Sequence, residues 1–236
     1  MSDISGSDNS GTVAVVIPAR NEAARIALTV LAALRLPRVG PVVVVDDAST
    51  DSTARVAEES GARVVRQPSA LGRAEAQRRG VAAVREMAGT GRLCLLFLDA
   101  DLGQSAERAV GLLEPVLTGA ADLALGVAAG GRDRARAATR RARAGVLRTT
   151  GFTASEPLGG ELCLGAAAFA AASAGPSPVV PGPGLIIDLL RQGFRVVEVP
   201  LELAHRPSRQ GLRATLRELR RYREVGREVA ARGNSR

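Results

Sequence analysis

The chain contains 236 residues, of which 46% are hydrophobic and only 2% are aromatic, with no tryptophan. This length is sufficient for one large domain, whose core must then be built from Val, Leu, Ile and Ala. The scarcity of aromatic side chains argues against base-stacking recognition of nucleic acid, and no apolar segment approaches the ~20 residues that span a membrane.

The two cysteines, Cys94 and Cys163, both lie in apolar sequence. Buried thiols are therefore favoured over a disulfide or a metal site, as is typical of a reducing compartment. Residues 1–11 are polar, rich in Gly and Ser, do not resemble a signal peptide and are expected to form a disordered tail. Together these features predict a cytoplasmic protein.

The formal net charge is +8, and the positive charge is concentrated in two Arg-rich segments. Residues 132–148 hold seven Arg and one Asp, and residues 206–236 hold ten Arg and three Glu, so the rest of the chain is mildly acidic. Three interpretations stay open: a solvated helix face, recognition of a phosphate-bearing acceptor with Arg206 and Arg209 closest to the site, and docking to an anionic membrane.

Short apolar segments alternate with helical patterns along the first hundred residues. Strands are predicted at 12–17, 42–45, 62–65 and 93–98, and helices at 22–35, 51–60 and 73–88. Ser49 or Thr50 is expected to cap the second helix. Strongly apolar strands separated by helices are typical of a mostly parallel sheet with helices on both faces. The predicted fold class is therefore α/β.

The second half of the chain is less regular and carries no sign of a separate domain. Helices are predicted at 105–117, within 132–148, at 184–191 and at 209–231, strands at 122–127 and 195–203, and loops at 151–160 and 175–184. The last helix is amphipathic. Its apolar face is expected to comprise Leu212, Leu216, Leu219, Tyr222 and Val229.

Polar clusters follow three of the predicted strands. They span residues 18–22, 46–51 and 99–101. Turn formation and helix capping would account for any one of them. Because ligands bind beyond the carboxyl ends of parallel strands, three clusters on one edge favour a binding site.

The third cluster suggests the chemistry. On an extended chain Asp99 and Asp101 would face one side and could share Mg²⁺ or Mn²⁺. Such a cation pairs with an anion such as a diphosphate, while carboxylates of the other clusters can accept hydrogen bonds from a nucleobase and a ribose. The chain has neither a dinucleotide-binding glycine motif nor a P-loop. A metal-bound sugar nucleotide therefore fits best.

Four ordered segments resemble motifs of family 2-type glycosyltransferases with the GT-A fold. They are residues 15–22, 45–51, 71–73 with Gly80, and 96–101. A weaker likeness continues through residues 193–200 and 205–206, and the second half is similar to bacterial enzymes of the glucosyl-3-phosphoglycerate synthase type and to polyprenyl-phosphate sugar transferases. The resemblance implies one GT-A domain over 12–236, with a nucleotide-sugar half (12–128), an acceptor half (129–205) and a basic C-terminal helix (206–236).

The resemblance also implies roles for individual residues. By this resemblance, Pro18, Ala19 and Glu22 would line the base and ribose, and Asp46 or Asp47 would contact the nucleobase. Arg73 would take the position where the family often has Lys. Asp99 and Asp101 would flank the ribose and the metal-bound diphosphate. His205, the only histidine in the chain, lies where a histidine completes the metal site of the phosphoglycerate-type enzymes. A surface or capping role is its alternative.

The acceptor side departs from the family pattern. Gly159 and Leu162 lie where relatives often have Ser and Arg. An inverting enzyme needs a carboxylate base near the acceptor hydroxyl, and the candidates are Glu161 and Asp188, with Glu156 a weaker one. A retaining enzyme needs no such base, so the stereochemistry stays open.

These observations predict a metal-dependent enzyme that moves a hexose from a UDP- or GDP-sugar to a phosphate-bearing small molecule or a polyprenyl phosphate. Membrane contact at the inner face and a homodimer stay open. The alternatives are a catalytically degenerate nucleotide-sugar-binding protein and a sugar nucleotidyltransferase. The latter is disfavoured because residues 18–22 do not resemble the Gly-rich opening loop of those enzymes.

Overall fold

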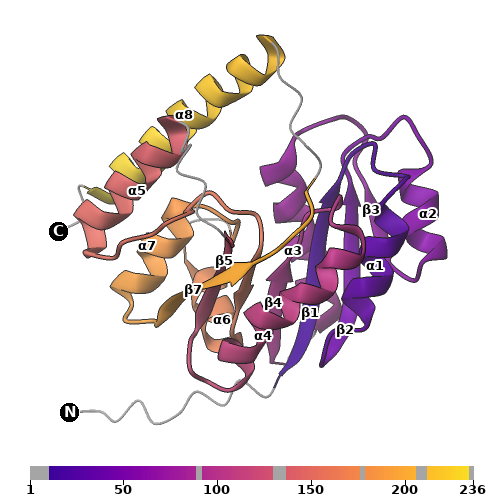
Figure 1. Ribbon diagram of the computed structural model, residues 1–236, viewed down its shortest axis with the longest axis horizontal. Helices are drawn as coiled ribbons and strands as arrows, with labels where there is room; N and C mark the ends of the chain where they lie inside the picture. The colour runs from indigo at the N-terminus through magenta and orange to yellow at the C-terminus, as the bar shows by residue number, and fades with distance from the viewer. Residues whose placement is uncertain (1–10, 89–91, 130–136, 176–178, 206–211, 234–236) are drawn as a thin grey trace.

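The protein folds around one seven-stranded sheet (Figure 1). The computed structural model describes residues 11–88, 92–129, 137–175, 179–205 and 212–233, with side chains of the last range from 219 onward. The strands are β1 (Thr12–Ala19), β2 (Val39–Asp46), β3 (Arg63–Arg66), β4 (Leu93–Phe97), β5 (Leu123–Ala128), β6 (Leu162–Leu164) and β7 (Val196–Leu201). Their order is β3-β2-β1-β4-β6-β5-β7, and only β6 runs antiparallel to its neighbours. The prediction of a mostly parallel sheet is confirmed.

Helices cover both faces of this sheet, as predicted. One apolar cluster lies under α1 (Ile26–Leu34), α2 (Thr53–Glu59), the 3-10 helix η1 (Gly103–Ala109) and α4 (Val110–Leu117). The opposite cluster lies under α3 (Arg73–Ala88), α5 (Ala137–Thr150), α6 (Ala166–Ala174), α7 (Pro183–Arg191) and α8 (Leu212–Gly233). Within the described residues, no helix is both long enough and apolar enough to cross a membrane.

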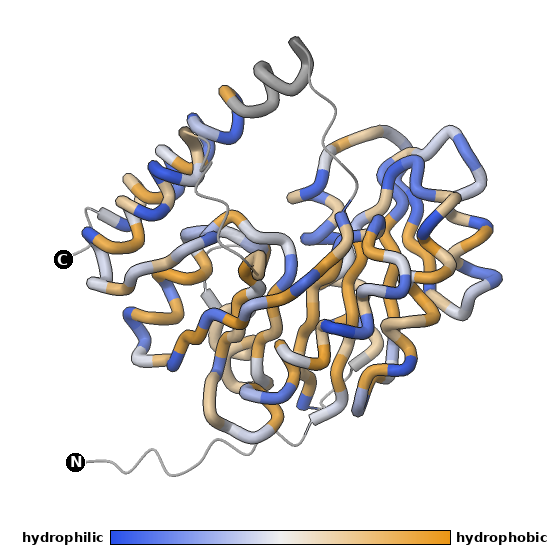
Figure 2. The backbone as a smooth tube through the Cα atoms, in the orientation of Figure 1, coloured by the Kyte–Doolittle hydropathy of each residue, from blue (hydrophilic) through white to orange (hydrophobic). Residues whose placement is uncertain are grey.

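Double-sided burial explains the continuous apolar strands. Along β1, Val13 and Val15 join one cluster, Ala14 and Val16 join the other, and all four are fully buried. Strand side chains alternate between faces, so a strand covered on both sides has no position for a polar residue. Figure 2 shows the strands mostly hydrophobic. Both cysteines are buried and unpaired, as predicted.

Strand β6 and helix α6 were not predicted. β6 spans only three residues, pairs with β4 and β5, and buries Leu162 in the core. A strand this short has no measurable periodicity. The loop predicted at 175–184 is wrong at its end, because Pro183 starts α7 at a position where a missing N–H has no cost.

The predicted cap of α2 is also wrong. Ser52 precedes the helix and makes no side-chain capping bond. Instead the Asp51 carboxylate accepts a hydrogen bond from the Thr53 N–H at 3.0 Å. The hydroxyl groups of Ser49 and Thr50 bond to Asn21 in the neighbouring loop, so tertiary contacts occupy the side chains that were predicted as caps.

Helices α5 and α8 pack side by side (Figure 1). The Arg-rich α5 is therefore not a wholly solvated helix, and Gly145 lies so close to α8 that a Cβ there would be 2.6 Å from Val229. Among the described side chains of α8, the buried hydrophobic ones are Val225 and Val229, whereas Leu219 and Tyr222 are 47% and 37% exposed. The predicted apolar face is confirmed only at Val229 among the side chains that the structure describes.

Candidate active site

The loops that follow β1 and β2 are hydrogen-bonded to each other. Asn21 Oδ1 accepts a hydrogen bond from Thr50 N at 2.8 Å, and Asn21 N donates to Ser49 Oγ at 2.9 Å. Glu22 N donates to Thr53 Oγ1 at 2.8 Å. Asn21 has a φ of 55°, in the left-handed region that asparagine tolerates. The first two polar clusters therefore share one edge of the sheet, as predicted.

Asp47 organises the segment that leads into α3. Its buried carboxylate accepts hydrogen bonds from Leu71 N at 2.7 Å, from Gly72 N at 3.0 Å and from Gln67 Nε2 at 3.3 Å. The next residue, Arg73, is the first of α3. Three donors to one buried carboxylate indicate that Asp47 serves the fold of this loop.

Asp46 has hydrogen-bonding capacity left. Its Oδ2 accepts one long bond from Ser49 N at 3.4 Å, and its buried Oδ1 has no partner among the described residues. In the sheet it is paired with Ala19. Ala19 packs in the core, and Pro18 is partly exposed beside it. An orphaned buried oxygen is uncommon and is often explained by a ligand.

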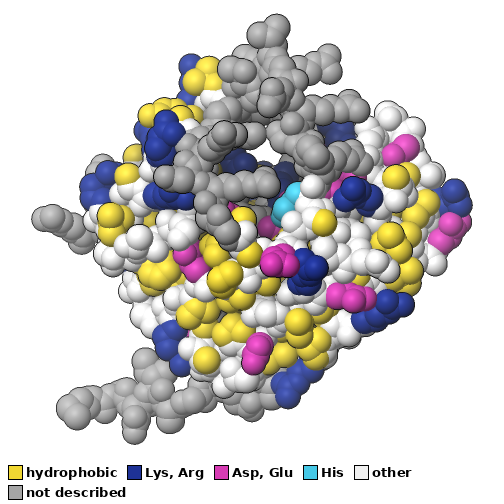
Figure 3. All heavy atoms as spheres, in the orientation of Figure 1, with side chains coloured by type: hydrophobic (Ala, Val, Ile, Leu, Met, Phe, Trp, Pro, Cys, Tyr) yellow, Lys and Arg dark blue, Asp and Glu magenta, His cyan; other side chains and the backbone are white. Residues whose placement is uncertain are grey.

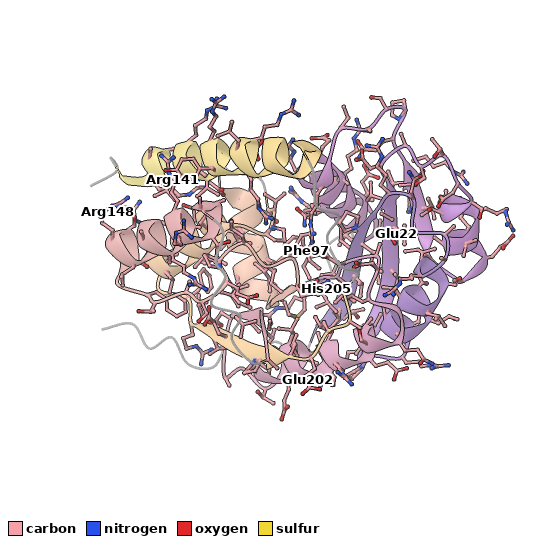
Figure 4. The ribbon with its side chains drawn as sticks, turned by 45° about the horizontal axis from the view of Figure 1, so that its top comes forward. Glu22, Phe97, Arg141, Arg148, Glu202 and His205 are labelled. Atoms are coloured by element: carbon pink, nitrogen blue, oxygen red, sulfur yellow. The ribbon has the colours of Figure 1, made fainter. Side chains whose placement is uncertain are left out.

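The Asp-x-Asp sequence and the histidine meet at the same edge. Asp99 and Asp101 follow β4 on a turn, and not on the extended chain that was predicted. His205 Nδ1 lies 3.8 Å from Asp99 Oδ2 and 3.6 Å from Asp101 Oδ1, and one ligand atom from each residue lies within 4.8 Å of the others. Figure 3 shows the histidine at the surface of this face, and Figure 4 shows it near the centre of the molecule.

The donor set of this cluster fits a hard divalent cation. Two carboxylates and one imidazole suit Mn²⁺ or Mg²⁺, which bind further oxygen ligands from water or phosphate. Asp99 and Asp101 are partly exposed and His205 is exposed, so a diphosphate has access to an ion held there.

Two further charged residues adjoin the cluster. Arg73 forms a two-pronged ion pair with Asp99, with Nη1 3.0 Å from Oδ2 and Nη2 against Oδ1. Glu161 is buried, and its Oε1 lies 3.8 Å from His205 Nε2. Gly160 leaves the room for these groups, because a Cβ there would lie 2.7 Å from Asp99 Oδ1. The structure thus gathers Arg73, Asp99, Asp101, Glu161 and His205.

The cluster shifts the pKa values of two of its members. Burial, with the Asp99 charge beside it, raises the pKa of Glu161 to about 7, against the opposing effect of His205 and Arg73. A hydrogen bond to Asp101 raises the pKa of His205 to about 8, although burial opposes this, and the Glu161 and Asp99 charges add to it.

We expect the metal-free protein to lose stability as the pH rises from about 5 to about 8. A group whose pKa is higher in the folded state contributes stability at low pH, and this contribution is lost as the pH rises through the folded pKa. The window runs from 4.5 to about 7 for Glu161 and from 6.5 to about 8 for His205. Thermal unfolding in EDTA measures the effect. A double variant, Glu161→Gln with His205→Gln, should flatten the profile, and an unchanged slope there would contradict it.

Asp188 is placed differently. Its carboxylate is held by Arg232 of α8, with Oδ1 2.7 Å from Nε and Oδ2 2.6 Å from Nη2. This pair ties α7 to α8, and no described contact joins Asp188 to the Asp99–His205 cluster. Glu156 lies in the loop before Gly159, and its carbonyl oxygen accepts a hydrogen bond from Gly159 N at 2.9 Å. Arg206 and Arg209 lie outside the described residues, so their interpretation as acceptor ligands stays a prediction.

Sequence reasoning missed the residues that support the site from behind. Arg25, Thr29 and Ser105 bond to the Asp-x-Asp turn or to the segment before His205. The sequence did mark Thr29, because it is the single polar residue in the apolar sequence of α1. In the structure it is fully buried. Nothing in the local pattern singles out Arg25 or Ser105.

This arrangement defines a class of protein. The carboxyl edge of the mostly parallel sheet brings together an Asp-x-Asp turn, a histidine and a buried carboxylate that can accept further hydrogen bonds. Such an edge is suited to a nucleoside diphosphate bound through a divalent cation. In agreement, the family model described as glycosyl transferase family 2 matches residues 14–171. The chain belongs to this family and is a glycosyltransferase with the GT-A fold.

Solved structures of glucosyl-3-phosphoglycerate synthase from Mycobacterium tuberculosis are similar to the chain. The complex with Mn²⁺, UDP and glucosyl-3-phosphoglycerate is 30% identical, with a TM-score of 0.70 over 94% of this chain and 80% of that one. The complex with Mn²⁺, UDP-glucose and phosphoglyceric acid is 29% identical, with a TM-score of 0.69 over 94% of this chain and 79% of that one. The complex with Mg²⁺ and UDP is 30% identical, with a TM-score of 0.69 and the same coverage of 94% and 79%. Comparison with curated protein sequences finds no match.

Proposed function

We propose that this glycosyltransferase moves glucose or another hexose from a nucleoside diphosphate sugar to a small acceptor that bears a phosphate group. The observation that carries the proposal is the convergence of Asp99, Asp101 and His205 within 4.8 Å. The similar structures support the donor and acceptor classes, because they hold Mn²⁺ or Mg²⁺, UDP or UDP-glucose, and phosphoglyceric acid.

The residues at the edge divide the donor between them. A divalent cation held by Asp99, Asp101 and His205 supplies charge neutralisation for the diphosphate. Arg73 adds a positive charge at the same end. Asp46, whose Oδ1 has no hydrogen-bond partner in the described part of the chain, is the carboxylate that we assign to the nucleobase. Glu22, Pro18 and Ala19 then face the nucleoside from the end of β1.

Glu161 is our candidate for the base in an inverting reaction. It is buried beside His205, and a pKa of about 7 suits proton transfer near neutral pH. We do not propose Asp188 as the base, because its carboxylate is paired with Arg232. A retaining reaction needs no such base, so the anomeric configuration of the product decides the role of Glu161.

The departures at Gly159 and Leu162 have packing explanations. A Cβ at Gly159 would lie 3.1 Å from the carbonyl oxygen of Gly126, and Leu162 is buried in β6. A side chain at Gly159 would require its neighbours to shift by a few tenths of an ångström, and a polar side chain at position 162 would be buried in the core. These residues therefore do not favour the catalytically degenerate alternative. Membrane contact and a homodimer stay predictions.

Thermal unfolding with UDP, GDP and their glucose and mannose derivatives, each with Mn²⁺ or with EDTA, tests the proposal. We expect UDP and UDP-glucose to stabilise the protein only in Mn²⁺, and addition of 3-phosphoglycerate to yield a glucosylated product and free UDP. Absence of metal-dependent stabilisation by every nucleotide would refute the proposal. Stabilisation without transfer would favour the degenerate binding protein, and synthesis of a sugar nucleotide from a nucleoside triphosphate would favour the nucleotidyltransferase.

A further inference from the structure

Helix α1 holds the Asp-x-Asp turn through one buried hydroxyl. Thr29 is fully buried. Its Oγ1 donates a hydrogen bond to Ala100 O at 2.9 Å and accepts one from Gly103 N at 2.8 Å. The two partners lie on either side of Asp101, so a single side chain fixes the backbone at both ends of the turn that carries this ligand.

Arg25 joins the same turn to the segment that carries the histidine. It lies one helical turn before Thr29, on the same side of the helix. Its Nη1, which carries two protons, donates to Asp101 O at 2.9 Å and to Ala204 O at 3.3 Å. One guanidinium nitrogen therefore bonds to the residue that supplies one ligand and to the residue that precedes His205.

The histidine depends on such backbone contacts. Its ring makes a long hydrogen bond to Asp101, with Nδ1 3.6 Å from Oδ1, and lies 3.8 Å from the nearest oxygens of Asp99 and Glu161. Its segment is also held through the backbone, because Ala204 N donates to Ser105 Oγ at 3.0 Å and Ala204 O accepts from Arg25. Backbone contacts made by Arg25 and Ser105 therefore help to set the position of His205 relative to Asp101.

We propose that Arg25 and Thr29 are positioning residues for the metal site. Thr29 fixes the Asp-x-Asp turn, and Arg25 holds that turn and the His205 segment at the separation that lets their side chains share one cation. This inference rests on the proposed function, since it concerns the same metal site. Residues that orient metal ligands typically contribute a factor of about 10 to 100 in metal affinity.

The charge of Arg25 allows a positioning role to be distinguished from an electrostatic role. A positive charge near a cation site repels the cation, so an electrostatic role alone predicts that its removal strengthens metal binding. The positioning role predicts the opposite sign. A role in stability alone predicts a lower unfolding temperature with unchanged metal affinity.

Mn²⁺ binding, followed by the loss of the electron paramagnetic resonance signal of free Mn²⁺ with and without UDP, tests the inference. We expect Arg25→Gln and Thr29→Val to bind Mn²⁺ about 10- to 100-fold more weakly than the unmodified chain. Thr29→Ser keeps the hydroxyl and should bind within about 3-fold. The matched control is Arg35→Gln. Arg35 lies at the C-terminal end of α1, and its Nη1 is 3.1 Å from Glu107 Oε1 at the surface. This substitution should leave the affinity unchanged.

The outcomes separate the two proposals. Failure of the unmodified chain to bind Mn²⁺ would overturn the proposed function and this inference with it. Binding by the unmodified chain with unchanged or tighter binding by Arg25→Gln and Thr29→Val would overturn the inference alone. If Thr29→Val fails to fold, Arg25→Gln and the rescue by Thr29→Ser decide the matter.

Discussion

Replacement of Asp101 by alanine is expected to abolish metal-dependent binding of the nucleotide. Asp101 contributes one of three side chains to the candidate cation site, and its Oδ1 lies 3.6 Å from His205 Nδ1. Loss of a ligand also removes the anchor of the diphosphate, so we expect UDP affinity in Mn²⁺ to fall by a factor on the order of 100 or more. Calorimetric titration of UDP in Mn²⁺ and in EDTA measures the difference.

The fold should tolerate this change, because Asp101 is partly exposed on a turn. Glu107→Ala is the matched control, since it removes an exposed carboxylate from the 3-10 helix just after the turn and should leave UDP binding intact. His205→Ala is expected to weaken metal binding less, because two carboxylates remain. Unchanged UDP affinity of Asp101→Ala in Mn²⁺ would count decisively against the assignment of the metal site.

Asp47→Ala is expected to destabilise the ligand-free protein by about 3 kcal/mol, because buried donors without partners cost about 1–3 kcal/mol each and water can satisfy some of them. The donors are the backbone N–H groups of Leu71 and Gly72 and the side chain of Gln67. Urea denaturation without ligand measures the change. Nucleotide binding should weaken only as far as the loop before Arg73 loses its conformation.

Asp46→Ala is the matched comparison on the adjacent residue. Asp46 is equally buried, yet from the residues that the structure describes it accepts only one long hydrogen bond, and its Oδ1 has no partner among them. Its removal should change the free energy of unfolding by less than about 1 kcal/mol and weaken UDP binding directly. If Asp46→Ala destabilises the protein as much as Asp47→Ala while UDP affinity is retained, the division of roles between the two carboxylates is wrong.

Much of the fold was predictable from local pattern. The apolar runs of β1, β2 and β4 identified strands buried on both faces, and the helical period of residues 73–88 matched α3 at both ends. The later segments were harder, because β6 is three residues long and takes its place only by pairing with strands distant in the chain. Such pairing has no local signal.

The sequence by itself determined the α/β class, the shared edge of the polar clusters and the Asp99–Asp101 pair, because periodicity and strand polarity are local properties of the chain. Only the tertiary structure decided that Asp47 serves the loop while Asp46 has an oxygen without a partner among the described residues. It also decided that Arg232 pairs with Asp188, and that Arg25 and Thr29 contact the segments that carry the candidate metal ligands. These assignments depend on which segments meet in space. Side chains of similar local sequence then differ in function because packing gives them different partners.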